Sequence, residues 1–185
     1  MSGWMELFES IEGCLRCPLY TGRNLCVPGE GNPYAKLMFV GEGPGAQEDR
    51  LGRPFVGQSG QLLTGMIAAI GLQRKDVYIA NIVKCRPPGN RAPTPDEAAG
   101  CMPYLNAQIA LVKPRIIVSL GATAGKYMLG DDVRVRRDHG KWVEKDDCFM
   151  MVTFHPSALL RDPTQKRDAW HDFLLIKEKL SSLEG

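Results

Sequence analysis

The chain has 185 residues, of which 44% are hydrophobic and 24% charged, and its formal net charge at pH 7 is +2. The length predicts one domain, residues 1–185, with a substantial apolar core, and the composition excludes a disordered or fibrous protein. Because the net charge is so small, a DNA-binding surface would have to come from local clusters of basic residues.

The N-terminal segment lacks the basic stretch and apolar core of a secretory signal, and no apolar run approaches the roughly 20 residues that span a bilayer. We therefore expect a cytoplasmic protein with no membrane contact. The chain has six cysteines, which in a reducing compartment are more often thiols, metal ligands or catalytic groups than disulfides.

Short apolar runs alternate with helical patterns along the chain. In chain order we expect a strand at 36–40, a helix at 61–70, a strand at 77–83, a helix from 94 to about 112, strands at 115–120 and 149–154, and a final helix at 168–183. Gly71 suits the end of the first helix, and Thr94 with Glu97 forms a capping box at the start of the second. Right-handed crossovers place helices on both faces of a parallel sheet, so the pattern predicts a three-layer α/β/α sandwich with a central four-stranded, mainly parallel sheet.

Four of the cysteines are candidate metal ligands. Cys14 and Cys17 form a C-x-x-C pair, Cys85 follows a predicted strand, and Cys101 lies in a predicted helix. Four thiolates suit either tetrahedral zinc or a 4Fe-4S cluster. The spacing alone leaves open whether all four share one centre or whether Cys85 and Cys101 are simply buried.

A glycine-rich loop, G-E-G-P-G-A-Q-E-D at 41–49, directly follows the first predicted strand. Its glycines allow close backbone approach to a ligand. The loop matches neither the dinucleotide fingerprint nor the phosphate-binding P-loop, and we expect no helix to begin there. The residues themselves leave its ligand open.

Three further side chains are candidates for contacts with a planar ligand. Phe55 lies between two turn-forming segments, and Asn81 lies in a strand, where a buried amide needs partners such as the edge of a base. Each could equally be an ordinary core residue. His155 stands at the end of the last strand, and the segment that follows it supplies an apolar wedge and an arginine for phosphate.

Taken together, G-E-G-P-G-A-Q-E-D at 41–49, G-R-P-F-V-G at 52–57, N-I-V-K-C-R-P-P-G-N-R at 81–91 and H-P-S-A-L-L-R at 155–161 resemble family 4 uracil-DNA glycosylases over most of the chain. The resemblance implies a monofunctional enzyme that hydrolyses the N-glycosidic bond of deoxyuridine in DNA, leaving an abasic site for base excision repair. It also implies a structural 4Fe-4S cluster bound by Cys14, Cys17, Cys85 and Cys101.

The resemblance implies a role for each residue of the uracil pocket. Phe55 would stack on a uracil flipped out of the helix, and Asn81 would read its O4 and N3 edge. Glu42 and Gly43 would line the pocket through backbone contacts. His155 would donate a hydrogen bond to uracil O2, where negative charge develops as the base leaves.

Other roles fall to residues around the pocket. Gly43 and Gly45 stand where family 1 enzymes carry an aspartate that handles the water and a tyrosine that excludes thymine. We therefore expect Asn90 to orient the water, and Glu48 to give electrostatic support or exclude the thymine methyl group.

The resemblance also implies a DNA-contacting segment. Leu159 would be the wedge that fills the gap left by the flipped base, and Ser157 and Arg161 would contact the DNA beside it. The arginines at 134, 136 and 137 are further phosphate candidates. The expected substrates are uracil-containing single- and double-stranded DNA, and we expect the protein to act as a monomer.

Two other classes of protein share some of these features. A non-catalytic iron–sulfur redox protein needs the cysteines but leaves His155, Asn81 and Phe55 unexplained, and it would release no base. A zinc-containing nucleic-acid-binding module would be colourless. Neither accounts for all four motifs together.

Overall fold

A computed structural model describes residues 2–184. Its centre is a six-stranded sheet in the order β1-β3-β2-β4-β6-β5. The strands are β1 (Glu30–Gly31), β2 (Leu37–Gly41), β3 (Tyr78–Asn81), β4 (Ile116–Leu120), β5 (Val143–Lys145) and β6 (Cys148–Thr153).

The four inner strands are the four that the sequence predicts. Neighbours β3, β2, β4 and β6 all pair in parallel, whereas β1 and β5 pair antiparallel at the two edges. The predicted four-stranded parallel core is therefore confirmed, and the sheet is wider by two edge strands. These have two and three residues, and β5 is exposed throughout, so neither carries the apolar run by which a buried strand is recognised.

The helices are α1 (Ser2–Glu12), α2 (Ala46–Leu51), α3 (Gln58–Ala69), α4 (Pro95–Val112), α5 (Gly121–Leu129), α6 (Val135–Asp138), α7 (Pro156–Arg161) and α8 (Lys166–Glu184). Short 3-10 turns lie at η1 (Pro18–Thr21), η2 (Arg74–Asp76), η3 (Pro88–Asn90) and η4 (Pro163–Gln165). In the described part of the chain, no helix is both long and apolar enough to cross a membrane.

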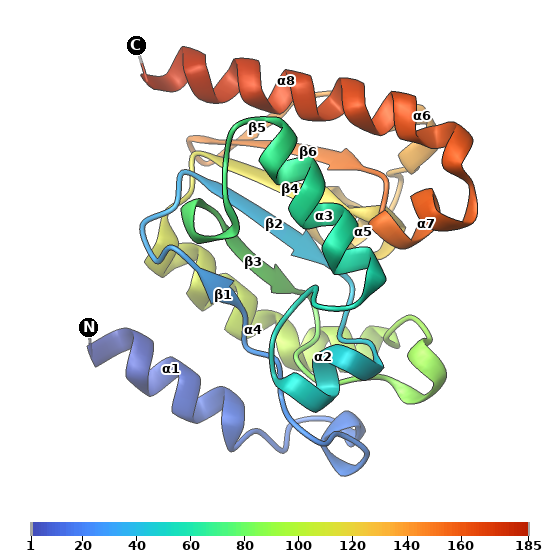
Figure 1. Cartoon of the computed structure of the whole chain (residues 1–185). Helices are drawn as coiled ribbons and strands as arrows, with labels where there is room; N and C mark the ends of the chain where they lie inside the picture. The colour runs from blue at the N-terminus through green and yellow to red at the C-terminus, as the bar shows by residue number, and fades with distance from the viewer. Residues whose placement is uncertain (1, 185) are drawn as a thin grey trace.

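The helices cover both faces of the sheet, as the sandwich prediction requires. Figure 1 shows α3 and α8 on one face and α4 on the other, with α1 outside α4. On the first face, Phe39 of β2 stacks on Phe173 of α8 at 5.7 Å between ring centroids. On the second, Val40 of β2 belongs to a buried cluster with Leu105 of α4. Because neighbouring residues of a strand point to opposite faces, Phe39 and Val40 pack into two different apolar cores, one on each side of the sheet.

Helix α4 begins as the sequence predicts. The Glu97 amide donates to the Thr94 hydroxyl at 3.2 Å, and the Thr94 amide donates to the Glu97 carboxylate at 2.8 Å. This reciprocal pair satisfies amides that would otherwise lack partners in the first turn.

Helix α2 corrects one expectation. It begins at Ala46, directly after the glycine-rich loop, with Gly45 as its N-cap, whereas we expected no helix there. The helix has only six residues, which is too short for a clear 3.6-residue apolar period. Its position brings Glu48 to the mouth of the cleft described next.

Candidate active site

A cleft of about 1030 Å³ lies at the carboxyl edge of the parallel strands. This is where open α/β sheets bind their ligands. It gathers residues from β3, from the loops and short helices that follow β2 and β3, and from α5 and α7. The predicted site residues that line it are Glu42, Gly43, Glu48, Phe55, Asn81, Asn90, His155, Ser157 and Arg161.

Asn81 is the most informative of these residues. Its side chain is 1% exposed, and no group within the described residues donates to its Oδ1. Leaving a buried acceptor without a donor costs about 1–3 kcal/mol, so proteins rarely do so without a reason. Gly41 leaves room for this side chain, because a Cβ there would lie 2.5 Å from Asn81 Oδ1. The free acceptor therefore points to a ligand that brings its own donor.

Lys84 forms a hydrogen bond to the backbone of Asn81. The Lys84 ammonium is fully buried and donates to the Asn81 carbonyl at 2.8 Å and to Gln108 Oε1 at 2.7 Å. Gln108 in turn donates to the Pro28 carbonyl at 2.6 Å. This network fixes the end of β3 and therefore the direction of the Asn81 amide.

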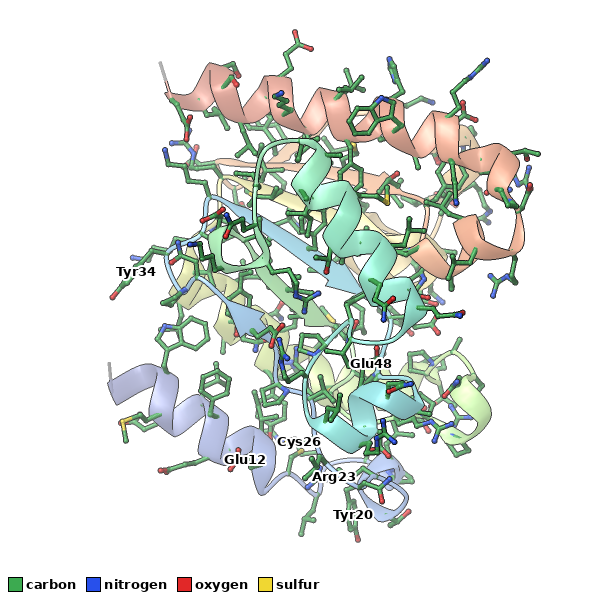
Figure 2. The ribbon with its side chains drawn as sticks, viewed as in Figure 1. Glu12, Tyr20, Arg23, Cys26, Tyr34 and Glu48 are labelled. Carbon is green, nitrogen blue, oxygen red and sulfur yellow. The ribbon has the colours of Figure 1, made fainter. Side chains whose placement is uncertain are left out.

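Phe55 forms a wall of the cleft. Its ring is 7% exposed and lies 5.6 Å from the ring of His155, between centroids, at an interplanar angle of 33°. Glu48, labelled in Figure 2, holds the loop after Phe55, because its Oε1 accepts from the amides of Val56 and Gly57 at 2.9 Å each. One oxygen of Glu48 is thus committed to the loop.

His155 presents a neutral ring with a defined tautomer. Its Nδ1 accepts from the Ser157 amide at 3.0 Å and lies 2.7 Å from the Ser157 hydroxyl. With Nδ1 an acceptor, the proton of the neutral ring is on Nε2. Burial, together with the nearby Arg161, lowers the pKa of His155 to about 4. At neutral pH the ring is therefore an uncharged donor through Nε2.

Two other predicted residues already have partners. The Thr123 hydroxyl donates to the Glu42 carboxylate, so Glu42 is held by its side chain as well as its backbone. Asn90 accepts from Arg86 Nε at 2.7 Å through its Oδ1, which leaves its amide NH₂ for another contact. Asn90 adopts a positive φ of 58°, a conformation that asparagine tolerates better than most residues.

The predicted wedge residue, Leu159, is buried. It is 1% exposed and packs with Phe154 and Ala169, whereas the next residue, Leu160, is 41% exposed and lines the cleft. In a helix, adjacent residues point about 100° apart, so α7 can turn only one of the two leucines outward. The structure therefore turns Leu159 inward and Leu160 outward, which is opposite to the orientation that a wedge at Leu159 requires.

The arginines before residue 140 divide between two environments. Arg136 lines the cleft and its side chain is 79% exposed. Arg136 lies 3.9 Å from the carboxylate of Asp162, whereas Arg137 pairs more closely with Asp138, at 2.7 Å. His139 is held by the buried carboxylate of Asp172, at 2.9 Å from Nδ1 to the nearer oxygen. Of this run, Arg136 is the basic side chain best placed to meet a ligand of the cleft.

The four cysteines Cys14, Cys17, Cys85 and Cys101 line a single small cavity between α1 and α4. Figure 2 shows Arg23 and Cys26 near each other, close to the end of α1. Within residues 2–184, no group of three or more His, Cys, Asp or Glu side chains is arranged to hold a metal ion.

Nitrogen donors face three of these sulfurs. Arg23 Nη1 donates to Cys85 Sγ at 3.2 Å, the Lys84 amide to Cys101 Sγ at 3.3 Å, and the Arg16 amide to Cys14 Sγ at 3.5 Å. Hydrogen bonds of this kind stabilise thiolates, the form that binds metals and iron–sulfur clusters. The donor set thus fits a group held by four thiolates.

Known proteins match this chain over most of its length. The family model for the uracil DNA glycosylase superfamily matches residues 28–174. A type-4 uracil-DNA glycosylase of Thermotoga maritima is 48% identical over 83% of this chain and 81% of its own, and one of Sulfurisphaera tokodaii is 43% identical over 96% and 85%. The chain belongs to the type-4 uracil-DNA glycosylase family. A type-5 uracil-DNA glycosylase of Pyrobaculum aerophilum shares 31% identity over 85% of this chain and 84% of its own.

Some residues of this type-4 uracil-DNA glycosylase site could not be found by sequence reasoning. Thr123 lies in α5, whose helix we did not predict, and Lys84 resembles an ordinary surface cation in the sequence. Leu160 was one position from the residue chosen. The signal that separates these side chains from their neighbours is their direction, which only the folded chain supplies.

Proposed function

We propose that this protein is a monofunctional uracil-DNA glycosylase that hydrolyses the bond between uracil and deoxyribose in DNA, releasing uracil and leaving an abasic site for base excision repair. The family membership supports this function. The single observation that carries it is the buried, unpartnered Oδ1 of Asn81 at the end of the cleft.

Recognition follows from the edge that Asn81 offers. An enzyme that acts on a base in DNA takes the base out of the stack and reads it in a fitted pocket. Asn81 Oδ1 accepts from uracil N3–H, and Asn81 Nδ2 donates to O4. Cytosine reverses both positions, with an unprotonated N3 and an amino group at C4, so it is rejected. Phe55 stacks on the ring, and the backbone of Glu42 and Gly43 lines the pocket.

Catalysis follows from the neutral state of His155. As the bond between C1′ and N1 breaks, uracil takes the electron pair and the sugar becomes oxocarbenium-like. His155 Nε2–H donates to O2, where the negative charge collects. Asn90 orients the water whose oxygen bonds to C1′, and Glu48 supports the positive charge on the sugar; the proton that this water releases neutralises the uracil anion. Neutral His155 can donate to O2 because its proton is on Nε2 while Nδ1 accepts from Ser157.

The contact with the DNA strand is made beside α7. Arg161 and Ser157 bind the backbone near the flipped nucleotide, with Arg136 as a further phosphate partner. Leu160, in place of Leu159, fills the gap in the stack, as apolar wedges do in other proteins that unstack bases. Both single- and double-stranded DNA are substrates, since the pocket reads only the extruded base.

A 4Fe-4S cluster is bound by Cys14, Cys17, Cys85 and Cys101. Four cysteines around one cavity suit a cluster, which takes one thiolate at each iron. When bound, the cluster supplies a cross-link among the segment after α1, the end of β3 and α4. The chain's own residues around the cleft perform the hydrolysis.

The protein acts as a single-domain monomer in the cytoplasm. All six cysteines are free of disulfides, which is what a reducing compartment favours.

The test is to measure the product. The purified, cluster-loaded protein is incubated with DNA that contains deoxyuridine, and the released base is identified by mass spectrometry. Free uracil with an alkali-labile strand supports the proposal. Release of a different base contradicts the specificity for uracil, and release of no base contradicts the proposal and favours a redox function for the cluster.

A further inference from the structure

Phe55 is held in an unusual backbone conformation. Its φ is +51°, a left-handed value that costs an aromatic residue free energy and that persists only where the surroundings impose it. Gly60 packs so closely that a Cβ at that position would overlap the Phe55 carbonyl group. The position of the Phe55 ring in the cleft depends on this backbone conformation.

Arg74 forms hydrogen bonds to the backbone at this point. It lies in η2, outside the cleft, and its side chain is 19% exposed. Its Nη1 donates to the Phe55 carbonyl at 2.9 Å, and its Nη2 donates to the Pro54 carbonyl at 2.8 Å. The two nitrogens of one rigid guanidinium thus bind two consecutive carbonyls, a geometry that lysine cannot reproduce.

Glu30, on the edge strand β1, fixes the guanidinium in turn. Its carboxylate pairs with Arg74 Nη2 and also accepts from Arg53 Nε and Nη2, at 2.7 and 3.1 Å. Although burial alone would raise it, the hydrogen bonds from Arg53 and Arg74 hold the pKa of Glu30 below its ordinary value. The carboxylate is therefore charged at neutral pH.

The far side of the same loop is held by Glu48, which accepts from the two amides that follow Phe55. The loop is thus fixed by carbonyl contacts on one side and amide contacts on the other. An exposed ion pair alone would add little to stability. Arg74 differs because its hydrogen bonds go to the backbone of a residue that faces the cleft.

We propose that Arg74 is a positioning residue for base recognition, which holds the Phe55 ring in its stacking position before the substrate arrives. This proposal rests on the proposed function, in which Phe55 stacks on uracil. Preorganisation of this kind removes the cost of ordering the loop when the base enters. Arg74 itself touches neither the base nor the sugar.

The test compares Arg74→Lys with Arg53→Ala. Arg74→Lys keeps a positive charge but loses the paired hydrogen bonds to the two carbonyls. Arg53→Ala removes an exposed partner of Glu30 and leaves those hydrogen bonds intact. We expect Arg74→Lys to raise both KM and the inhibition constant of free uracil about tenfold, with kcat changed less than threefold, because a stacking contact is made in the ground state and the transition state alike. Arg53→Ala should retain the wild-type constants.

The proposal is overturned if Arg74→Lys is folded, cluster-loaded and active but has the wild-type KM and inhibition constant of uracil. It is also overturned if Arg53→Ala raises both constants as much as Arg74→Lys does. Should Arg74→Lys fail to fold, Glu30→Gln replaces it, with an expected rise of about threefold in both constants, and unchanged constants overturn the proposal. If the wild-type protein releases no uracil, the proposed function fails; a wild-type enzyme with insensitive Arg74 and Glu30 variants contradicts only the positioning role.

Discussion

His155 shows how burial can prepare a side chain for one task. The Ser157 contacts fix its tautomer, and burial keeps it neutral, with a pKa of about 4. We predict that His155→Ala lowers kcat about 10²–10³-fold, as the loss of a donor to a developing oxyanion does in other enzymes, while KM changes little. Single-turnover rates on a uracil oligonucleotide measure this, and an equal loss through KM alone would contradict the role.

The same lowered pKa predicts a pH dependence of stability. Because the folded-state pKa of about 4 lies below the value of 6.5 for a free histidine, the unfolded chain binds the proton first as the pH falls. The contribution of His155 is thus fully present above pH 6.5 and is lost between pH 6.5 and about 4, by up to about 3 kcal/mol. Urea unfolding at several pH values in this range should show that the free energy of unfolding depends less steeply on pH in His155→Gln than in the wild type. The same pH dependence in both proteins would refute the lowered pKa.

The residues that line the cleft were easier to predict than those that support them. Asn81 and His155 lie in or beside a predicted strand end, where α/β sheets place their ligands, and Phe55 belongs to one of the motifs that carry the family resemblance. Arg74 and Lys84 act on the backbone of those residues from elements with no pattern of their own. Support of this kind depends on three-dimensional direction, which is absent from a linear pattern.

At the scale of one element, α7 separates two adjacent leucines that the sequence does not distinguish. Leu159 is buried and Leu160 is 41% exposed. We predict that Leu159→Ala lowers the free energy of unfolding by about 2–5 kcal/mol, and that Leu160→Ala changes it by less than about 0.5 kcal/mol. In excision assays, Leu160→Ala should lose more activity on double-stranded than on single-stranded DNA, since only the duplex leaves a gap to fill.

The two variants are controls for each other. Equal destabilisation would mean that α7 buries both leucines. A Leu160→Ala enzyme with the same relative loss on both kinds of DNA would show that Leu160 is not the wedge.

The other elements differ in how far sequence could predict them. The four parallel strands and α4 were predictable because their apolar runs and capping box are strong local signals. Strands β1 and β5 were not, since they have two and three residues and no apolar run, and helix α2 was not, since six residues are too few to show a helical period. Short elements of this kind carry Glu30 and Glu48.

At the scale of the whole molecule, the cysteine cavity brings together segments that are far apart in the chain. Cys85 lies just beyond Lys84, which holds Asn81, so loss of the proposed cluster should loosen the fold before it alters chemistry. We predict that Cys85→Ala lowers the iron content and the unfolding midpoint. Cys148→Ala, a half-buried cysteine of β6 outside the cysteine cavity, should keep the wild-type iron content.

Iron analysis, visible absorbance and urea unfolding of both cysteine variants check this prediction. A Cys85→Ala protein with full iron content and unchanged stability would exclude Cys85 as a ligand. Equal iron loss in Cys148→Ala would show that the effect is not specific to the cavity.

The central claim is that Asn81 reads uracil at the end of the cleft. The most direct measurement compares wild type and Asn81→Asp on end-labelled oligonucleotides that carry a single uracil or a thymine in its place, with alkali cleavage at the abasic site. A carboxylate cannot donate to O4, so we predict scission of the uracil strand alone by the wild type and a loss of about a hundredfold or more in Asn81→Asp, because one hydrogen bond is lost and the charged oxygen that replaces the donor repels O4. Equal scission by both proteins, or none by cluster-loaded wild type, would contradict the account.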